Sequence, residues 1–417
     1  ELPGGLGAGP AGLVLLFAEL ARTDPAHRPA ARAWLAVAAE RAEADRTARP
    51  GLHDSLPALS FALHRVAEGP GEHRVDRARL GTRLALLVGQ RTAAEQARIA
   101  RGTPCPSREA FDLVAGLAGL GAHLLDRHEA GETTPLESVL TALVALTRPL
   151  ARYGLPGWWV AEDPQHRIPV VPRAGHAGLG LAHGLSGPLA LLALAWRAGV
   201  EVPGQAEAIR TLAEWLLARQ RTDQAGPWWP LRLRLGELRG PAERPDPAEP
   251  DWAAGPDGPL AWPGAPRLGA PRPSWCSGSP GIARALQLAG TALGVPRWRA
   301  VAVGALRAAL ERPAELAPPL TGAGLCHGWA GLLQTGWRVA AESGSPELAA
   351  RLPRLTQLLL DRCDPGFPFA VTPPDRPSGP GAAGGLLTGA AGVALALHTV
   401  ATGAAPATTW DRALLLA

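Results

Sequence analysis

The chain has 417 residues, of which 47% are hydrophobic, yet no stretch approaches the roughly 18 uninterrupted apolar residues of a membrane span. Its formal charge is only +4 and its arginines are spread among acidic residues, which favours a solvated mixed-charge surface over a nucleic-acid interface. Four unevenly spaced cysteines do not resemble a secreted disulfide framework, so we expect a protein of the reducing cytoplasm.

The N-terminal residues lead almost directly into the first copy of an internal repeat. Because the chain begins at Glu1 without an initiator methionine, we expect residues of the native N-terminus to be missing. Each copy has a Gly-x-x-Gly followed by small and apolar residues at helical spacing. The first glycines of six copies are Gly9, Gly116, Gly184, Gly278, Gly328 and Gly389. A seventh copy, SLPALSFALHRV, lies in the wide first gap, and we align Leu56 and Leu59 with its missing glycines.

Amphipathic stretches alternate with these apolar runs along the chain. Examples are AARAWLAVAAERAEA, LESVLTALVALTRPL, QAEAIRTLAEWLLARQ and ELAARLPRLTQLLLDRC. A helix that is apolar all round must be buried, whereas an amphipathic helix can cover it from outside. The sequence therefore predicts an all-α fold, one α/α toroid over residues 1–417 with seven inner and seven outer helices. The glycine turns at one end of every inner helix then gather at one mouth of the barrel.

Two irregular regions interrupt the helical pattern in the middle of the chain. The first runs from about residue 153 to residue 178 and precedes the copy at Gly184. The second, residues 222–273, is an insertion rich in Pro, Gly and Trp, in which the alternation of WWPLRLRLGEL predicts a short β-hairpin. Because each region runs directly into a repeat turn, we expect both to lie near the mouth.

Side chains with catalytic or metal-binding chemistry stand just before the repeat glycines. Within six residues of a first glycine are Asp112, His183, Arg272, Cys276, Cys326 and His327. Equivalent positions in a closed array of repeats face equivalent places. The sequence therefore predicts that these six side chains converge on one mouth of the toroid.

The two cysteines of this set share one position in the repeat. Cys276 and Cys326 each stand two residues before a first glycine, in adjacent copies, and His327 follows the second cysteine. Two thiolates and an imidazole form a three-ligand zinc site with an open fourth position. The alternative is buried structural cysteine, which packs as a small hydrophobic residue. Cys105 and Cys363 do not share the position, and we interpret both as structural or free thiols.

The other three residues each have a functional and a structural interpretation. His183 shares the position of His327 without a preceding cysteine, which fits a general acid or base, or a histidine satisfied near a helix start. Asp112 fits a carboxylate that orients His183, or a helix N-cap. Arg272 fits a fixed positive charge for an oxyanion, or a solvated loop arginine. His176, in the loop before His183, is interpreted as a surface residue or a neighbour of the site.

The repeat blocks taken together resemble the lanthionine synthetase C family, the cyclases of lanthipeptide biosynthesis, and most of all its stand-alone class I members. The resemblance is carried by GLAHGLSGPLALLALA, SWCSGSPGIARAL and GLCHGWAGLL, with FDLVAGLAG and the closing WDRALLLA. It implies an α/α toroid that binds Zn²⁺. The implied zinc ligands are Cys276, Cys326 and His327, and the implied catalytic residues are His183, Asp112 and Arg272. Many members carry a tyrosine where this chain has Ser277, which shifts proton donation toward His183.

The implied reaction is an intramolecular Michael-type addition in a dehydrated precursor peptide made of leader and core. A zinc-activated cysteine thiolate of the peptide attacks dehydroalanine or dehydrobutyrine and closes a lanthionine or methyllanthionine thioether ring. The resemblance also implies a dehydratase and an export transporter as partners, and hence a cytoplasmic protein at the inner membrane face. Two rivals remain. One is a non-catalytic zinc- or thiol-binding scaffold of the same family, and the other is a zinc-dependent thiol prenyltransferase, whose metal set includes an aspartate.

Overall fold

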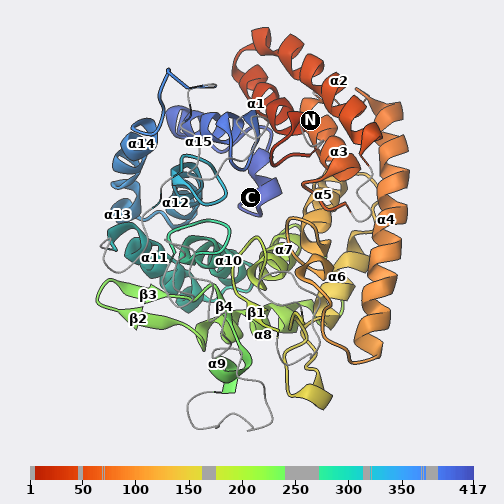
Figure 1. Cartoon of the computed structure of the whole chain (residues 1–417), viewed down its shortest axis with the longest axis vertical. Coiled ribbons are helices and arrows are strands. Elements are labelled where there is room, and N and C mark those ends of the chain that lie inside the picture. The colour runs from red at the N-terminus through yellow and green to blue at the C-terminus, as the bar shows by residue number, and fades with distance from the viewer. Residues whose placement is uncertain are drawn as a thin grey trace, which may run out of the picture.

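The computed structural model describes residues 5–45, 50–67, 69, 71–161, 175–239, 272–312, 320, 322–367, 369, 371 and 384–417. Within these residues the helices form two concentric layers around a central axis (Figure 1). Helices that follow the repeat turns make the inner layer, and the helices between them make the outer layer. This arrangement is the α/α toroid that the sequence predicts.

The inner layer contains a helix from every copy of the repeat. In the described part of the chain these are α1 (Pro10–Thr23), α3 (Ser55–Val66), α5 (Leu117–Glu129), α7 (Ser186–Arg197), α10 (Ser279–Ala292), α12 (Trp329–Ser343) and α15 (Ala390–Thr402). Each inner helix contacts the next, and α15 contacts α1, so the ring closes. Every residue is buried in long stretches such as Ser186 to Ala195 of α7 and Ser279 to Gly290 of α10, whereas α1 and α15 also carry half-buried residues.

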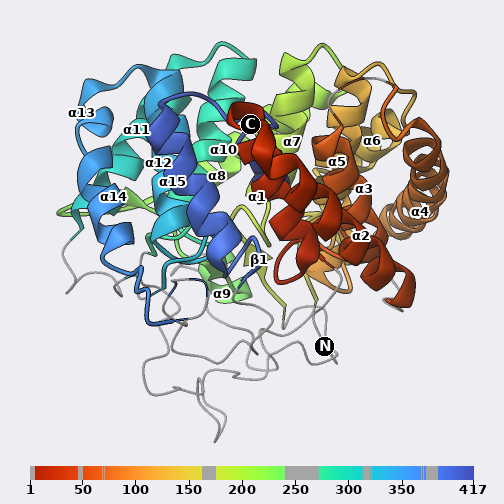
Figure 2. The same cartoon turned by 90° about the horizontal axis from the view of Figure 1, so that it is seen from above.

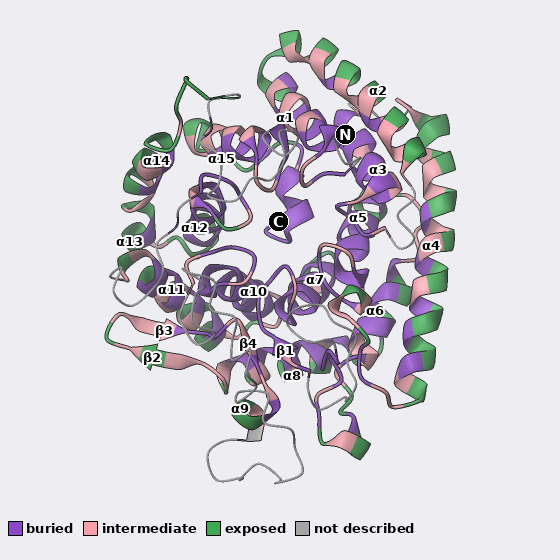
Figure 3. Cartoon of the chain, in the orientation of Figure 1, coloured by how far each residue is buried: buried purple, intermediate pink, exposed green. Residues whose placement is uncertain are grey.

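The outer layer consists of amphipathic helices that cover the inner ring. They are α2 (Arg28–Ala44), α4 (Arg74–Ala100), α6 (Leu136–Ala145), α8 (Gln205–Leu217), α11 (Pro296–Glu311), α13 (Pro346–Ala349) and α14 (Leu352–Leu360). In α4 the buried residues Leu84, Val88, Thr92, Glu95 and Arg98 recur every three or four positions, which makes one buried stripe. Figure 3 shows this pattern, with buried inner helices and exposed outer faces. None of the described helices is both long and apolar enough to cross a bilayer.

The C-terminal segment takes a different course from the predicted seventh outer helix. After α15 the described chain forms no further outer helix, and the 3₁₀ helix η7 (Trp410–Leu414) lies in the middle of the ring (Figure 1). The residues from Trp410 to Leu416 are all buried there. The chain's own end thus occupies the centre of the ring.

Polar contacts attach the C-terminal segment to several inner helices. The Asp411 carboxylate accepts hydrogen bonds from Arg338 Nε at 2.7 Å and Nη2 at 2.8 Å, and from Gln334 Nε2 at 2.8 Å. Arg284 Nε donates to the Leu416 carbonyl at 3.0 Å, and Trp275 Nε1 donates to the Leu414 carbonyl at 3.1 Å. A buried charge without a partner is costly, so these pairs hold the segment in one position.

In the described residues, four short strands form two separate antiparallel pairs. The pair of β2 (Arg221–Asp223) and β3 (Gly226–Trp228) is a hairpin that begins seven residues before the predicted run. The run itself supplies β4 (Arg232–Leu233), which pairs with β1 (Ala177–Gly178) from the other irregular region, and the short helix α9 (Leu235–Arg239) follows. Seen at right angles, β1 and α9 lie at one end of the toroid (Figure 2). The remainder of the predicted insertion, residues 240–271, lies outside the described residues.

A ring of backbone hydrogen bonds joins the seven repeat turns. Each bond runs from an N–H two or three residues before the first glycine of a repeat, or before Ser55 in the second repeat, to the carbonyl at the corresponding place in the next repeat. The N···O pairs are Leu6–His53 (3.0 Å), His53–Val114 (3.3 Å), Leu113–Ala182 (3.0 Å), Ala182–Cys276 (2.8 Å), Cys276–Cys326 (3.2 Å), Cys326–Leu387 (2.8 Å) and Leu387–Gly7 (2.9 Å). The mouth is therefore a closed circle, and residues at one repeat position share one level of it.

This ring corrects the alignment of the second repeat. A Cβ atom on Gly51 would lie 2.2 Å from Ala115 Cα, and glycines four residues before the first glycine of other repeats pack in the same way. Gly51 therefore identifies Ser55, and not Leu56, as the equivalent of the first glycine. The predicted alignment was one residue late because Ser55 and Ala58 occupy positions that are glycine in the other copies.

Candidate functional site

Cys276, Cys326 and His327 form a cluster at the mouth. Their potential ligand atoms all lie within 4.8 Å of one another, and no other group of at least three His, Cys, Asp or Glu side chains in the described ranges comes so close. The turns that lead into α10 and α12 place them side by side, because Cys276 N donates to Cys326 O at 3.2 Å. Two sulfurs and an imidazole are a donor set that suits zinc, so the residues fit the predicted metal.

The cluster favours a negative charge on one sulfur. A hydrogen bond with the Cys326 thiol, assisted by His327 and Ser277, lowers the pKa of Cys276 well below its usual range although the residue is only 7% exposed. The same contact raises the pKa of Cys326, and the hydrogen bond between Cys276 and the imidazole raises the pKa of His327. The thiolate attracts a cation, and a bound metal would displace the proton that this contact favours on His327.

His183 and Asp112 form a hydrogen-bonded pair at the same mouth. His183 Nδ1 lies 2.7 Å from Asp112 Oδ2, and Asp112 is fully buried while His183 is partly exposed. Asp112 Oδ1 accepts from the backbone N–H of Ala115 at 2.8 Å. The carboxylate thus fixes a proton on Nδ1 and leaves Nε2 for chemistry at the mouth. Asp112 does not cap α5, whose N-cap residue is Gly116.

The turn of His183 lies against the turn of Cys276, since Ala182 N donates to Cys276 O at 2.8 Å. Arg272 precedes the same turn and is half-buried. Burial lowers the pKa of Arg272, while the Cys276 charge acts in the opposite direction. Within the described ranges its guanidinium has no hydrogen bond or ion pair, although its backbone carbonyl accepts from Ser279 N at 3.1 Å. Arg272 thus supplies positive charge beside the cluster.

The corrected alignment reveals two mouth residues that the sequence reasoning missed. His53 takes the repeat position of Cys276, and Asp54 takes that of His183. His53 is 4% exposed, its Nε2 lies 3.0 Å from Ala413 O, and burial lowers its pKa to about 4. Burial also raises the pKa of Asp54, whose Oδ2 accepts from Gly51 N at 3.2 Å. The spacing of Gly51 was the sequence signal for both.

The remaining cysteines and His176 stand apart from the cluster. Cys105 is fully buried, its Sγ lies 3.6 Å from Gly157 O, and burial raises its pKa. Cys363 is half-buried, with Sγ 3.5 Å from Leu359 O, and burial raises its pKa too. The His176 backbone pairs with Val160 in an isolated bridge.

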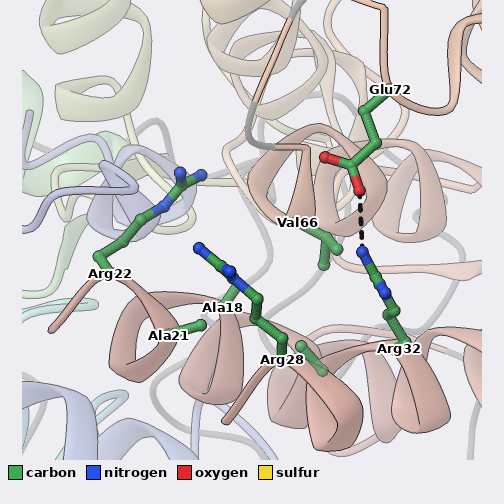
Figure 4. A pocket seen from close by; sticks show the side chains of 8 residues that line it. Ala18, Ala21, Arg22, Arg28, Arg32, Val66 and Glu72 are labelled. Carbon is green, nitrogen blue, oxygen red and sulfur yellow. Dashed lines mark hydrogen bonds and ion pairs between the residues drawn. The ribbon is translucent and has the colours of Figure 1, made fainter. Parts of the chain in front are cut away.

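Among the pockets in the described part of the chain are two small ones, of which one touches the site. It lies beside His327 and is lined by Gly322, Ala323, Gly324, Gly328, Leu387 and Thr388. The other lies between α1, α2 and the end of α3, with Arg22, Arg28 and Arg32 around it (Figure 4). There Arg32 Nη2 is 3.4 Å from Glu72 Oε1, and Arg22 Nη2 donates to the carbonyls of Arg65 and Ala67, so both of these arginines have partners within the protein.

Comparisons with known proteins support one family. The chain is similar in structure to a solved protein described as nisin cyclase, with a TM-score of 0.74 and 18% sequence identity over 99% of this chain and 92% of the other. A search of curated proteins gives no match. The sequence profile of the lanthionine synthetase C-like proteins matches residues 1–415, and this chain therefore belongs to the lanthionine synthetase C-like family.

Proposed function

We propose that this protein is a zinc-dependent lanthipeptide cyclase. Its reaction is the intramolecular Michael-type addition of cysteine thiolates of a precursor peptide to dehydroalanine or dehydrobutyrine, which forms lanthionine or methyllanthionine rings. The observation that carries the proposal is the juxtaposition of the Cys276, Cys326 and His327 cluster with the His183 and Asp112 pair, in a chain of this family. The similar solved protein bears the name of a cyclase.

The metal ligands would be Cys276, Cys326 and His327. When bound, Zn²⁺ supplies a Lewis acid that lowers the pKa of a peptide thiol. Cys326 is half-buried and His327 is exposed, so the cluster can be reached from the mouth. Cys276 is the buried member of the cluster. Three protein ligands are typical of catalytic zinc sites, in which substrate or water takes the fourth position.

The other residues handle the charge and the proton of the addition. As the C–S bond forms at the β-carbon, the electrons of the C=C bond move toward the amide oxygen of the dehydro residue. The positive charge of Arg272 then stabilises that oxygen. His183 delivers a proton from Nε2 to the α-carbon, which completes the thioether, and the thiol proton replenishes the histidine. Asp112 holds Nδ1–H throughout and keeps the ring in one orientation.

The experiment that tests this function is incubation with a dehydrated, cysteine-containing precursor, followed by thiol alkylation and mass spectrometry. Cyclisation removes free thiols without a change in peptide mass, so a cyclised product takes up no alkylating agent. If thiols persist while zinc is bound, the protein is a thiol-binding scaffold and the cyclase proposal fails. A prenyltransferase is disfavoured because no carboxylate joins the metal cluster in the described residues.

The proposal extends to partners and location. We propose that the substrate is a dehydrated precursor with leader and core, and that a dehydratase and an export transporter gather with this protein at the inner face of the membrane. The family supports this extension. Co-purification of the tagged protein with both partners from cells that express the whole gene set tests it, and recovery of the cyclase alone after mild cross-linking would count against a complex.

A further inference from the structure

The residue four positions before the first glycine of each repeat is itself glycine in five of the seven copies. These are Gly5, Gly51, Gly180, Gly324 and Gly385. A Cβ atom at any of them would lie between 2.0 and 2.8 Å from backbone of the next repeat, so close packing around the ring excludes a side chain there. The two exceptions are Asp112 and Ser274.

Both exceptions direct a side chain to a residue of the site. Asp112 Oδ2 lies 2.7 Å from His183 Nδ1. Cys276 Sγ donates to Ser274 Oγ at 3.8 Å, within hydrogen-bond range for sulfur, and the serine is 3% exposed. The ring therefore admits a side chain at this position only in the two repeats where that side chain contacts a proposed catalytic or metal-binding residue. Ser274 and Asp112 thus occupy the same repeat position, and the side chain of each contacts a site residue, Cys276 and His183 respectively.

A second hydroxyl reaches the same sulfur. Ser277 Oγ lies 3.3 Å from Cys276 Sγ. Cys276 thus has a serine on either side, whereas no hydroxyl hydrogen bond reaches the Cys326 sulfur in the described residues. The two cysteines share one repeat position but not one environment. The asymmetry resides in the two serines, one of which stands where family members often carry tyrosine.

Hydroxyl groups respond to the charge of the sulfur they face. A serine O–H rotates freely, so it can accept from a thiol and donate to a thiolate. A hydrogen bond donated to a metal-bound thiolate withdraws electron density from the sulfur and leaves more positive charge on the metal. A more positive metal lowers the pKa of the next thiol that binds to it.

We propose that Ser274 and Ser277 are positioning residues that donate hydrogen bonds to the Cys276 thiolate and thereby set how readily the metal site deprotonates an incoming peptide thiol. This inference rests on the metal site of the proposed function and deepens it. It also makes Cys276 the weaker and Cys326 the stronger electron donor of the pair.

The test replaces zinc with Co²⁺, whose sulfur-to-metal charge-transfer absorption reports the electron density on the thiolates. In the purified full-length protein, Ser274→Gly and Ser277→Ala each move that absorption to lower energy, and the double variant moves it further. Ser274→Gly restores the residue that five other repeats carry, so the backbone tolerates it. Ser274→Ala provides a second version of the same loss.

The second readout is the pH at which added N-acetylcysteine binds the cobalt, seen as a new charge-transfer component. Loss of one hydroxyl raises the midpoint of this transition by about half a pH unit, the size expected of one weak hydrogen bond. Ser277→Thr keeps the hydroxyl, so we expect it to show the wild-type charge-transfer energy and the wild-type pH midpoint. Thr388→Val is the matched control, because Thr388 has the repeat position of Ser277 and no hydrogen bond to either sulfur in the described residues.

Three outcomes separate the inference from the proposed function. Shifted absorption and a raised midpoint in the serine variants, with both controls unchanged, support the inference whether or not any peptide is cyclised. Unchanged spectra in cobalt-loaded serine variants overturn the inference alone. Failure of the unmodified protein to bind cobalt or zinc removes the metal site and overturns both.

Discussion

His183 and the metal ligands have separable tasks at the residue scale. We expect His183→Ala to keep zinc and to lose cyclisation by about 10²- to 10⁴-fold, because it removes only the proton donor. Cys326→Ala is expected to lose zinc as well, since two ligands hold the ion much less tightly than three. Metal analysis of both purified variants beside the alkylation assay checks this division. Equal zinc loss in the two variants would contradict it.

His53 gives the protein a predictable response to acid. Its folded pKa is about 4 because burial disfavours the charged ring, against 6.5 in an ordinary environment. The unfolded state therefore binds the proton more readily, so the stabilising contribution is complete above the ordinary pKa and is lost as pH falls from about 6.5 toward 4. From this residue alone we expect the free energy of unfolding to fall by about 2 kcal/mol between pH 7.5 and pH 5.

Urea denaturation of the wild type and of His53→Gln at these two pH values measures that contribution. Glutamine retains a donor for the Ala413 carbonyl but does not titrate, so its own loss of stability on acidification is smaller by the same amount. Asp112 and His183 also act electrostatically on His53, so the Asp112→Asn variant serves as a second reference. Parallel pH profiles for wild type and His53→Gln would show that His53 does not carry the effect.

The site was predictable at the residue scale wherever glycine marked the repeat. Glycine spacing alone brought Cys276, Cys326 and His327 together, and the structure confirms their proximity. It also brought Asp112 to His183, although their catalytic roles remain predictions. His53 escaped because its repeat has lost both marker glycines. A repeat recognised by its glycines is misaligned where the turn keeps its backbone geometry but the glycines have been replaced, as Ser55 and Ala58 replace them here.

At the element scale, the second glycine of the turn, present in six of the seven repeats, sets how closely an inner helix packs against the segment that leads into it. A Cβ on Gly331 would lie 1.9 Å from the Leu325 carbonyl oxygen, and backbone cannot move aside as a side chain does. We expect Gly331→Ala to lower the free energy of unfolding by about 1 to 3 kcal/mol. Gly89, within α4, has nothing within 4 Å of its Cβ position. Gly89→Ala is expected to raise stability by about 0.5 to 1 kcal/mol.

Thermal or urea unfolding of the two alanine variants beside the wild type checks the pair. The same glycine-to-alanine substitution is then expected to lower the free energy of unfolding on an inner helix and to raise it on an outer helix. If Gly331→Ala raised the stability instead, the turn would have space for a Cβ atom beside the Leu325 carbonyl, which contradicts the structure.

Some elements were beyond sequence reasoning for physical reasons. The pairing of β1 with β4 joins two-residue strands more than fifty positions apart, and neither is long enough to show alternation. Within the 228–238 run, Arg232 and Leu233 pair with a strand from the other irregular region, and Trp228 belongs to the hairpin of β2 and β3. The predicted seventh outer helix is absent from the described residues, because the chain after α15 forms η7 in the middle of the ring.

At the scale of the whole molecule, the buried pair of Asp411 and Arg338 ties the chain's end to the inner ring. Asp411 is fully buried and Arg338 is 9% exposed, so removal of the carboxylate leaves a buried guanidinium unpaired. We expect Asp411→Ala to lower the free energy of unfolding by about 3 to 5 kcal/mol. For the exposed pair of Arg307 and Glu347, 3.6 Å apart, Glu347→Ala should cost less than about 1 kcal/mol.

Chemical denaturation of the two variants measures the contrast, and hydrogen exchange of the segment from Trp410 to Leu416 locates it. Exchange is expected to rise in the centre of the ring for Asp411→Ala and to stay unchanged for Glu347→Ala. Similar stability losses in the two variants would mean that the buried network contributes no more than a surface contact.

The closed circle of backbone bonds at the mouth also limits how such a protein can change. An open array of repeats can lengthen or shorten by whole units, because its ends are free. This circle has no ends, since Leu387 bonds back to Gly7, so adding or deleting a repeat would break it. New chemistry at the mouth must then come from substitutions at fixed repeat positions, while the number of repeats stays the same. A comparison of the mouth residues at each repeat position is therefore a direct way to see how relatives with this architecture differ in chemistry.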